Sequence, residues 1–383
     1  MKKVGILTSS PSFINNYGAV LQAYALTTMV DKLGADACII KYADKHEYVQ
    51  GRVSIKDRLK GVVFNSNISL RTRVKIILNK LMNRSVYPVF EKFQREYIDF
   101  HDSEYIDYCG LEQIAKQFYA FIVGSDQVWN PNVHHGVNDP GYFLQFVPKG
   151  IKRIAYAPSM GVNVLPDSCK TNLKEYLSAF DNLSIREESG RRIIRDVCNM
   201  DVPVVLDPTM LLEREDYDKI KSMLPDVGDK YILYYKFGSI KCVETTVRKI
   251  AKHYGYKVVC VPAGLDTGFK QDYRIGPREF IDLISNASLV CTDSFHATVF
   301  SIIYNKPFLA FCREDETRNK VTMNSRITGI LDMLALREAW AGMGEHIDIH
   351  ALPKVNYSRA NTILAEKRKE AIAYLKNALE INE

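Results

Sequence analysis

The residues best suited to chemistry lie in the segment 289–303. An apolar, β-prone run leads into a Thr-Asp-Ser-Phe-His motif, and apolar residues at helical spacing follow it. This pattern predicts a strand, a tight turn, and a helix capped by Thr292, Asp293 or Ser294. In α/β proteins ligands bind outside the carboxyl ends of strands, where a helix N-terminus favours an anion.

His296 is our candidate general acid/base, because histidine exchanges protons near neutral pH and this one falls in the first helical turn. Asp293 is the carboxylate that we expect to orient its ring. A lone histidine is more often structural than catalytic. The assignment therefore depends on its place directly after a predicted strand.

A second candidate, Arg186, follows a predicted strand at 182–185. A guanidinium at a strand end can form paired hydrogen bonds with a carboxylate or a phosphate, so Arg186 is a hypothesised anion clamp. The alternative is a salt bridge to Glu187 or Glu188, which follow it directly.

The first strand-to-helix loop contains Asn16, Tyr17 and Gly18. Its spacing lacks the G-x-G-x-x-G pattern, which disfavours a dinucleotide site. Gly18 would let the helix N-terminus approach a ligand closely. The alternative is a plain turn with a capping asparagine.

Another loop, after the predicted strand 120–123, places Ser125, Asp126 and Gln127 close to Trp129. Polar groups beside an indole face suit a sugar ring, because they can bind hydroxyls while the ring stacks. The alternative is a capped helix start with Trp129 in the core.

The elements that must position these residues alternate between strand and helix, which predicts an α/β protein with parallel sheets. With 383 residues, two domains are expected. We predict a first domain at 1–206, a linker at 207–229, a second domain at 230–355 and a terminal helix within 356–383. Strands are expected at 4–8, 37–42, 120–123, 153–157, 182–185 and 202–206, and then at 231–235, 257–261, 289–292 and 307–311.

The region of about 50–98 is a basic helical insertion in the first domain. Between residues 52 and 84, nine Lys or Arg residues stand against one acid, Asp57. This stretch could contact anionic lipid headgroups or a lipid pyrophosphate. The alternative is a solvated helical hairpin over the sheet edge.

Composition narrows the remaining classes. Apolar residues make up 46% and charged residues 25%, as in ordinary globular proteins, and a net charge of +6 does not by itself indicate a nucleic-acid partner. Eight cysteines without a C-x-x-C pair favour a reducing compartment. The chain shows neither a signal-peptide pattern nor a membrane-spanning run, so we expect a cytoplasmic protein, with peripheral membrane contact as an option.

Seven motifs follow one another along the chain: NYGAVLQAYAL from residue 16, VGSDQVWNP from 123, AYAPSMG from 155, SIRE from 184, DPT from 207, TDSFH from 292 and KPF from 306. Their order resembles the polysaccharide pyruvyl transferase family over nearly the whole chain. The resemblance implies two Rossmann-like domains in a GT-B-like arrangement, with an interdomain cleft. It implies transfer of pyruvate from phosphoenolpyruvate to a sugar as a ketal, without a metal or a cofactor.

In this resemblance Arg186 matches the family's donor-binding arginine, and His296 matches the histidine of a short Arg-x-His element. The chain departs from the family at Ser294, where better-known members carry arginine. The missing charge has four candidate sources, Lys306, Arg313, Arg318 and Arg326.

The resemblance thus places the donor on the second domain and the acceptor on the first. The expected donor-binding residues are Arg186, Ser294, Phe295, Lys306 and Arg326. The expected acceptor-binding residues are Asn16, Tyr17, Gly18, Ser125, Asp126, Gln127 and Trp129. The acceptor is a sugar of a surface polysaccharide, with a polyprenyl-pyrophosphate-linked oligosaccharide as one form.

Three rival interpretations remain open. A nucleotide-sugar glycosyltransferase could share the architecture. A relative that binds glycans without catalysis is a second rival, because Ser294 removes one expected charge. Transfer of a different group within the same family is the third.

Overall fold

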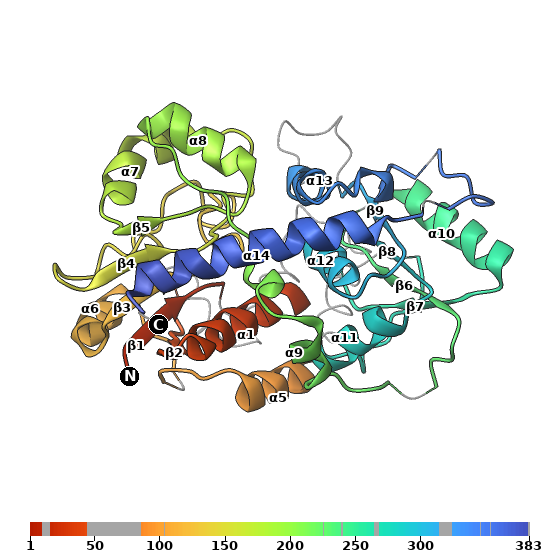
Figure 1. Ribbon diagram of the computed structural model, residues 1–383, viewed down its shortest axis with the longest axis horizontal. Coiled ribbons are helices and arrows are strands. Elements are labelled where there is room, and N and C mark those ends of the chain that lie inside the picture. The colour runs from red at the N-terminus through yellow and green to blue at the C-terminus, as the bar shows by residue number, and fades with distance from the viewer. Residues whose placement is uncertain are drawn as a thin grey trace, which may run out of the picture.

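The computed structural model describes residues 1–9, 16–43, 86–102, 104–224, 226–238, 240–263, 268–313, 324–344, 346–352 and 354–381. It contains two five-stranded parallel sheets with helices packed around them (Figure 1). The predicted α/β class, with two Rossmann-like domains, is confirmed. The two domains face each other across a cavity, as the GT-B-like prediction requires.

The first sheet has the strand order β2-β1-β3-β4-β5. Its strands are β1 (Lys3–Leu7), β2 (Asp36–Ile39), β3 (Ala120–Val123), β4 (Lys152–Ala155) and β5 (Asn182–Leu183). Its helical segments are α1 (Tyr17–Lys32), α5 (Tyr87–Tyr97), α6 (Tyr108–Ile114), η1 (Ala115–Gln117), α7 (Asp167–Ser178) and α8 (Glu188–Cys198).

The second sheet has the order β10-β9-β8-β6-β7. Its strands are β6 (Tyr231–Tyr235), β7 (Lys257–Cys260), β8 (Leu289–Thr292), β9 (Phe308–Phe311) and β10 (Trp340–Gly342). The helical segments that follow the first domain are η2 (Pro208–Met210), α9 (Arg214–Asp218), α10 (Lys241–Tyr254), α11 (Pro277–Asn286), α12 (Phe295–Ile303), α13 (Asn324–Met333), η3 (Arg337–Ala339) and α14 (Tyr357–Leu379).

Both sheets reverse their strand order next to the first strand of the domain, between β1 and β3 and between β6 and β8. Ligands of doubly wound sheets bind at this switch point. The register puts Leu7, Val123 and Ala155 side by side at the carboxyl edge of the first sheet. Tyr235 and Thr292 are paired in the same way in the second sheet. The loops after these strands are therefore neighbours, although they are far apart in sequence.

Most predicted strands are confirmed within one or two residues, because buried parallel strands read as short apolar runs. The expected strand at 202–206 forms only an isolated bridge from Val204 to Ile185. The short edge strand β10 was not predicted, since its Trp-Ala-Gly sequence carries no strand pattern.

The two domains share one apolar core. Tyr17 at the start of α1 is fully buried, stacks on Phe280 of α11 with ring centroids 4.6 Å apart, and packs edge-on against Tyr235. Its hydroxyl donates to the Ile275 carbonyl at 2.7 Å. The start of α1 is thus fixed against the second domain.

Helix α14 crosses from the second domain back to the first (Figure 1). At its beginning the Tyr357 hydroxyl donates to the Lys306 carbonyl. Further along, Arg368 Nε donates to the Met210 carbonyl at 2.7 Å, and the Tyr374 hydroxyl donates to the Ala155 carbonyl at 3.0 Å. The predicted terminal helix is confirmed, and it bridges both halves.

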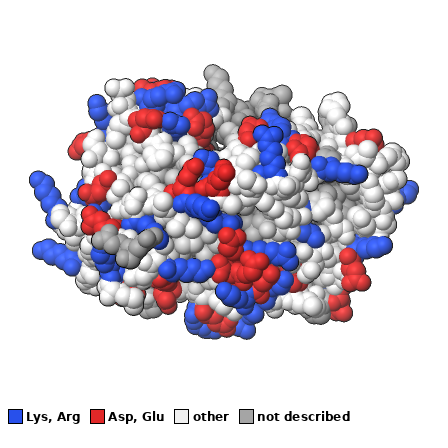
Figure 2. All heavy atoms as spheres, viewed as in Figure 1, with Lys and Arg blue, Asp and Glu red and all other residues white. Residues whose placement is uncertain are grey.

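The basic stretch 52–84 lies outside the described residues, so its predicted membrane contact stays a prediction. The described end of the insertion forms α5, whose Phe90 packs against Tyr17. On the face shown in Figure 2, positive and negative side chains are mixed. None of the described helices is both long and apolar enough to span a bilayer.

Candidate active site between the two domains

The predicted strand–turn–helix is present as β8 and α12. Ser294 is the N-cap of α12, and its Oγ accepts from the Ala297 amide at 3.4 Å. His296 lies in the first turn with only 7% of its surface exposed. Its Nε2 has no hydrogen-bond partner among the described residues and lies 3.7 Å from Asp207 Oδ2.

Asp207 is the carboxylate at the centre of the site, and it comes from the opposite side of the cavity. Its Oδ2 accepts from Ser125 Oγ at 2.7 Å and from Arg186 Nη1 at 3.0 Å, and its Oδ1 accepts from the Thr209 amide and hydroxyl. Burial acts to raise the pKa of Asp207, but the charges of His296 and Arg186 outweigh it and hold this pKa well below its usual range. Asp207 is therefore ionised.

The sequence analysis identified Asp207 only as part of a family motif and gave it no role. One local signal was present, because an aspartate that follows an apolar run and precedes Pro208-Thr209 stands at a strand end. Its contacts with His296 and Arg186 are long-range, and no local pattern contains them.

Arg186 is buried with its guanidinium against this carboxylate. Its Nε lies 3.5 Å from Glu187 Oε2, and its Cζ lies 4.7 Å from the centroid of the Phe295 ring. Burial acts to lower the pKa of Arg186, but the charges of Asp207 and Glu187 raise it overall. Within the described chain, Nε and Nη2 have no hydrogen-bond partner. The alternative of a salt bridge to Glu187 is thus confirmed, and the anion clamp stays a prediction.

A cavity of about 230 Å³ opens beside Arg186. It is lined by residues 186–188 and 204–207, by Phe295, and by one face of α13 that begins with Arg326. Arg326 is 6% exposed, and its Nε also has no hydrogen-bond partner among the residues described. Burial lowers the pKa of Arg326 to about 10, and the charges of Arg186 and Arg313 add to this effect.

Three of the predicted catalytic and donor-side residues lie in structural positions: Asp293, Ser294, which caps α12 as one of the expected caps, and Lys306. Asp293 does not orient His296: its oxygens accept from the Phe237 amide at 2.8 Å and the Gly238 amide at 2.6 Å, which joins the loops after β8 and β6. The carboxylate facing His296 is Asp207 instead. Ser294 is a helix cap.

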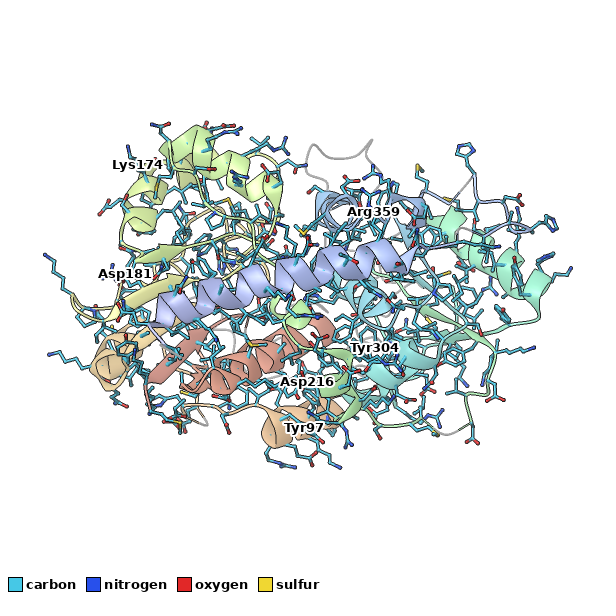
Figure 3. The ribbon with its side chains drawn as sticks, in the orientation of Figure 1. Tyr97, Lys174, Asp181, Asp216, Tyr304 and Arg359 are labelled. Carbon is cyan, nitrogen blue, oxygen red and sulfur yellow. The ribbon has the colours of Figure 1, made fainter. Side chains whose placement is uncertain are left out.

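Lys306 is the third of these, because it lies past the opposite end of α12 from His296. Figure 3 labels Tyr304, which ends that helix and donates to Asp218 at 3.0 Å. Burial lowers the pKa of Lys306, and the nearby charge of Arg214 adds to this effect. Lys306 therefore belongs to a charged group beside α9.

Asn16, Tyr17 and Gly18, at the start of α1, make structural contacts. Asn16 caps α1, with Oδ1 accepting from the Gly18 amide at 3.0 Å and the Ala19 amide at 3.3 Å. The capping alternative was thus right for Asn16, and Tyr17 is a core residue. Gly18 allows a close approach between α1 and His296, whereas the sequence predicted a close approach to a ligand. A Cβ added at Gly18 would lie 2.0 Å from His296 Nδ1.

The second acceptor loop is divided between the site and the core. Ser125 bonds Asp207 directly. Asp126 is 7% exposed, adopts a positive φ of 69°, and acts on Arg186 through its charge. Gln127 Oε1 accepts from the Asn130 side chain.

Trp129 was expected to stack on a sugar, and this expectation is wrong. Its ring is 2% exposed and stacks on Phe143 with centroids 4.8 Å apart, and its Nε1 donates to the Tyr142 carbonyl at 2.8 Å. A tryptophan beside polar residues can face either way, and here the apolar interior determines its position.

The fold and site define a two-domain α/β protein with a buried His296–Asp207 pair and, between its Rossmann-like domains, a cavity lined by two arginines. No group of three or more His, Cys, Asp or Glu side chains in the described segments could hold a metal ion. The family model of polysaccharide pyruvyl transferase matches residues 16–313, and the chain belongs to this family.

No curated protein sequence matches the chain. Among solved structures, it is similar to the Methanocaldococcus jannaschii UDP-GlcNAc 2-epimerase in complex with UDP-GlcNAc and UDP. The identity is 12%, the match covers 96% of this chain and 99% of the other, and the TM-score is 0.47. The chain is also similar to the Neisseria meningitidis UDP-GlcNAc 2-epimerase bound to UDP-GlcNAc. There the identity is 12%, the match covers 100% of this chain and 98% of the other, and the TM-score is 0.45. For an E. coli heptosyltransferase the identity is 9%, the match covers 83% of this chain and 91% of the other, and the TM-score is 0.35.

Proposed function

We propose that this protein transfers pyruvate from phosphoenolpyruvate to two hydroxyls of a sugar, forming a ketal and releasing phosphate. The sugar belongs to a surface polysaccharide or its lipid-linked precursor. One observation carries the proposal: Arg186 and Arg326 line one cavity beside the His296–Asp207 pair, and both have buried N–H groups without a hydrogen-bond partner among the described residues. Family membership supports the same reaction.

The buried guanidinium groups account for donor binding. An unsatisfied buried donor destabilises a protein, and a bound anion removes that penalty by accepting its hydrogen bonds. Phosphoenolpyruvate has a carboxylate and a phosphate, so each arginine has an anionic group to bind. Pairing at both ends also fixes the orientation of the enol carbon between them.

The reaction requires the movement of two protons. The first sugar hydroxyl adds to C2 of the donor, and its proton balances the one delivered to the methylene carbon, which becomes a methyl group. The second hydroxyl then takes the place of phosphate on C2, and its proton leaves with the phosphate. His296 is the proposed acid/base for these transfers, a role typically worth about a hundredfold to ten-thousandfold in rate.

Asp207 complements His296 in this scheme. It stays ionised in the site, because the surrounding positive charges and hydrogen bonds hold its pKa low. A carboxylate 3.7 Å from the imidazole stabilises the ring when it carries a second proton. Asp207 therefore takes the positioning role that the sequence analysis gave to Asp293.

The acceptor side of the cleft is formed by the first domain. Asp126 and Gln127 follow β3 at its carboxyl edge, next to Ser125, and are the proposed contacts for sugar hydroxyls. No metal or cofactor takes part in the proposed chemistry. The basic stretch 52–84 is proposed to hold a lipid-linked acceptor at the cytoplasmic face of the membrane.

The test is to incubate the protein with phosphoenolpyruvate and a panel of galactose-type acceptors. We expect inorganic phosphate to be released and the acceptor to gain the mass of a pyruvate ketal. Binding of a nucleoside diphosphate sugar without affinity for phosphoenolpyruvate would instead establish the glycosyltransferase. Glycan binding without any donor affinity would establish the non-catalytic relative.

A further inference from the structure

The cavity has a wall that the proposed chemistry does not yet use. Helix α13 presents Arg326, Gly329, Ile330 and Met333 to it, at the i, i+3, i+4 and i+7 spacing of a single helix face. The opposite wall is formed by Arg186 and residues 204–207. A ligand next to Arg186 would therefore also touch α13.

The charge on this wall is not balanced by hydrogen bonds. Arg326 is buried beside a second guanidinium, Arg186, and its Nε has no hydrogen-bond partner among the described residues. Asp207 and Glu187 lie close to Arg186, whereas Glu187 and Asp126 act on Arg326 only through their charges, without an ion pair among the described residues. Two like charges that face the same space favour a ligand with two anionic groups.

Gly329 borders this cavity from an exposed position on α13. A Cβ added at Gly329 would meet no heavy atom within 4 Å in the described structure. Glycine inside a helix is less stable than alanine, so stability alone does not favour glycine here. With no packing around it, Gly329 leaves the cavity open at this wall.

Three other charges were candidates to supplement Arg186, and none of them lines the cavity among the described residues. The Arg313 guanidinium packs over the Phe237 ring at 4.5 Å, and the Arg313 amide donates to Asn324 Oδ1 at 2.9 Å. Lys306 lies past the far end of α12. Arg318 lies outside the described residues. Ser294 contributes a cap and no charge.

We infer that α13 completes the donor site, with Arg326 binding the second anionic group of the donor and Gly329 leaving the space that the donor fills. This inference rests on the proposed function, and it deepens it by naming the residues that select donor size and charge. The ligand class is a small molecule with a carboxylate and a phosphate at opposite ends.

The experiment is calorimetric titration of the full chain with phosphoenolpyruvate, inorganic phosphate and pyruvate, which needs no acceptor. We expect Arg326→Gln to weaken phosphoenolpyruvate binding by about tenfold or more, the loss typical of one charged hydrogen bond. Its affinity should approach that for phosphate alone. Arg337→Gln is the matched control, because Arg337 is exposed and pairs with Asp332.

Gly329→Leu tests the space without removing a charge. We expect it to fill the cavity and weaken phosphoenolpyruvate binding by at least tenfold, while the melting temperature stays the same or rises. Gly329→Ala should have a much smaller effect on binding. This series stays informative even if Arg326→Gln fails to fold.

Two results would overturn the inference, and they differ. If Arg186→Gln abolishes binding while Arg326→Gln and Gly329→Leu bind like wild type, α13 is not part of the donor site, although the proposed function stands. If the wild-type protein does not bind phosphoenolpyruvate at all, the proposed donor is wrong and the inference fails with it.

Discussion

At the scale of single residues, the site depends on Asp207, which lines the cavity, and on His296 in the first turn of α12. His296 Nε2 and Asp207 Oδ2 are 3.7 Å apart, and the same oxygen binds Arg186 and Ser125. In the proposed function, proton transfer and anion binding are thus linked through one carboxylate. Substitutions at these residues should separate the two functions.

Replacing His296 with Asn should lower turnover by about a hundredfold to ten-thousandfold, because the general acid/base is lost. Affinity for phosphoenolpyruvate should stay within a few fold, since the guanidinium groups remain. Phosphate release and calorimetry measure the two quantities. His253→Asn is the control, as His253 is exposed on α10. Near-full turnover in His296→Asn would exclude the proposed role.

Asp207→Asn should destabilise the protein at pH 7 by about 3–5 kcal/mol, because it breaks a buried ion pair. The folded-state pKa of Asp207 is depressed, so its stabilisation is present above the unfolded value and is lost as pH falls below it. The unfolded value is about 4. Urea unfolding should therefore show the gap between variant and wild type narrowing as the pH drops from 7 to below about 4. A gap that does not change with pH would contradict this assignment.

At the scale of elements, the N-termini of α1 and α12 meet at the site. Asn16 caps α1 and Ser294 caps α12, so both helices begin at fixed places. Gly18 then lies against His296. The position of the catalytic ring is thus set by a helix of the other domain.

Gly18→Ala should displace the His296 ring, because the new Cβ would lie 2.0 Å from Nδ1. We expect a loss of stability of about 1–3 kcal/mol from overpacking, together with a turnover drop of more than tenfold. Thermal unfolding and phosphate release measure these effects. Unchanged turnover would show that the ring position next to α1 is irrelevant to the chemistry.

The elements were predictable from sequence where the signals are local. The apolar run 289–292 followed by a Thr-Asp-Ser cap gave β8 and α12 with correct bounds. The partner of His296 was not predictable in this way, because Asp207 reaches it only through the packing of two domains. The nearest carboxylate in sequence, Asp293, was therefore chosen wrongly.

Side-chain direction was the other part that sequence could not give. Trp129 and Tyr17 belong to motifs that also carry polar residues, yet both face the interior. Arg186 and Arg326 were predicted as donor contacts, and the structure brings them to one cavity. A buried arginine in an otherwise apolar setting is a stronger signal of function than an aromatic residue, because burying it unpaired is costly.

At the scale of the whole molecule, α14 holds the two domains together. It buries Leu364, Ala371 and Leu375, and contacts both halves of the chain. Several of its charged residues are exposed, whereas the Arg368 side chain is largely buried against the Met210 carbonyl. The relative placement of the domains therefore depends on this helix as well as on α1.

Leu375→Ala should lower stability by about 2–5 kcal/mol, the usual cost of a cavity at a fully buried leucine. Glu366→Ala, on the exposed side of the same helix, should change it by less than about 0.5 kcal/mol. Urea unfolding with a donor-binding measurement on the folded variants checks both. Equal effects of the two substitutions would show that α14 is not part of the cooperative core.

The division of the proton-transfer pair between two domains has a consequence for fidelity. Asp207 follows the edge of the first sheet and His296 begins a helix of the second, so any opening of the cavity separates them. In the proposed function, a donor bound to an opened molecule would meet an incomplete pair and would be protected from reaction with water. The geometry between the domains would then determine whether a sugar hydroxyl or a water molecule reacts.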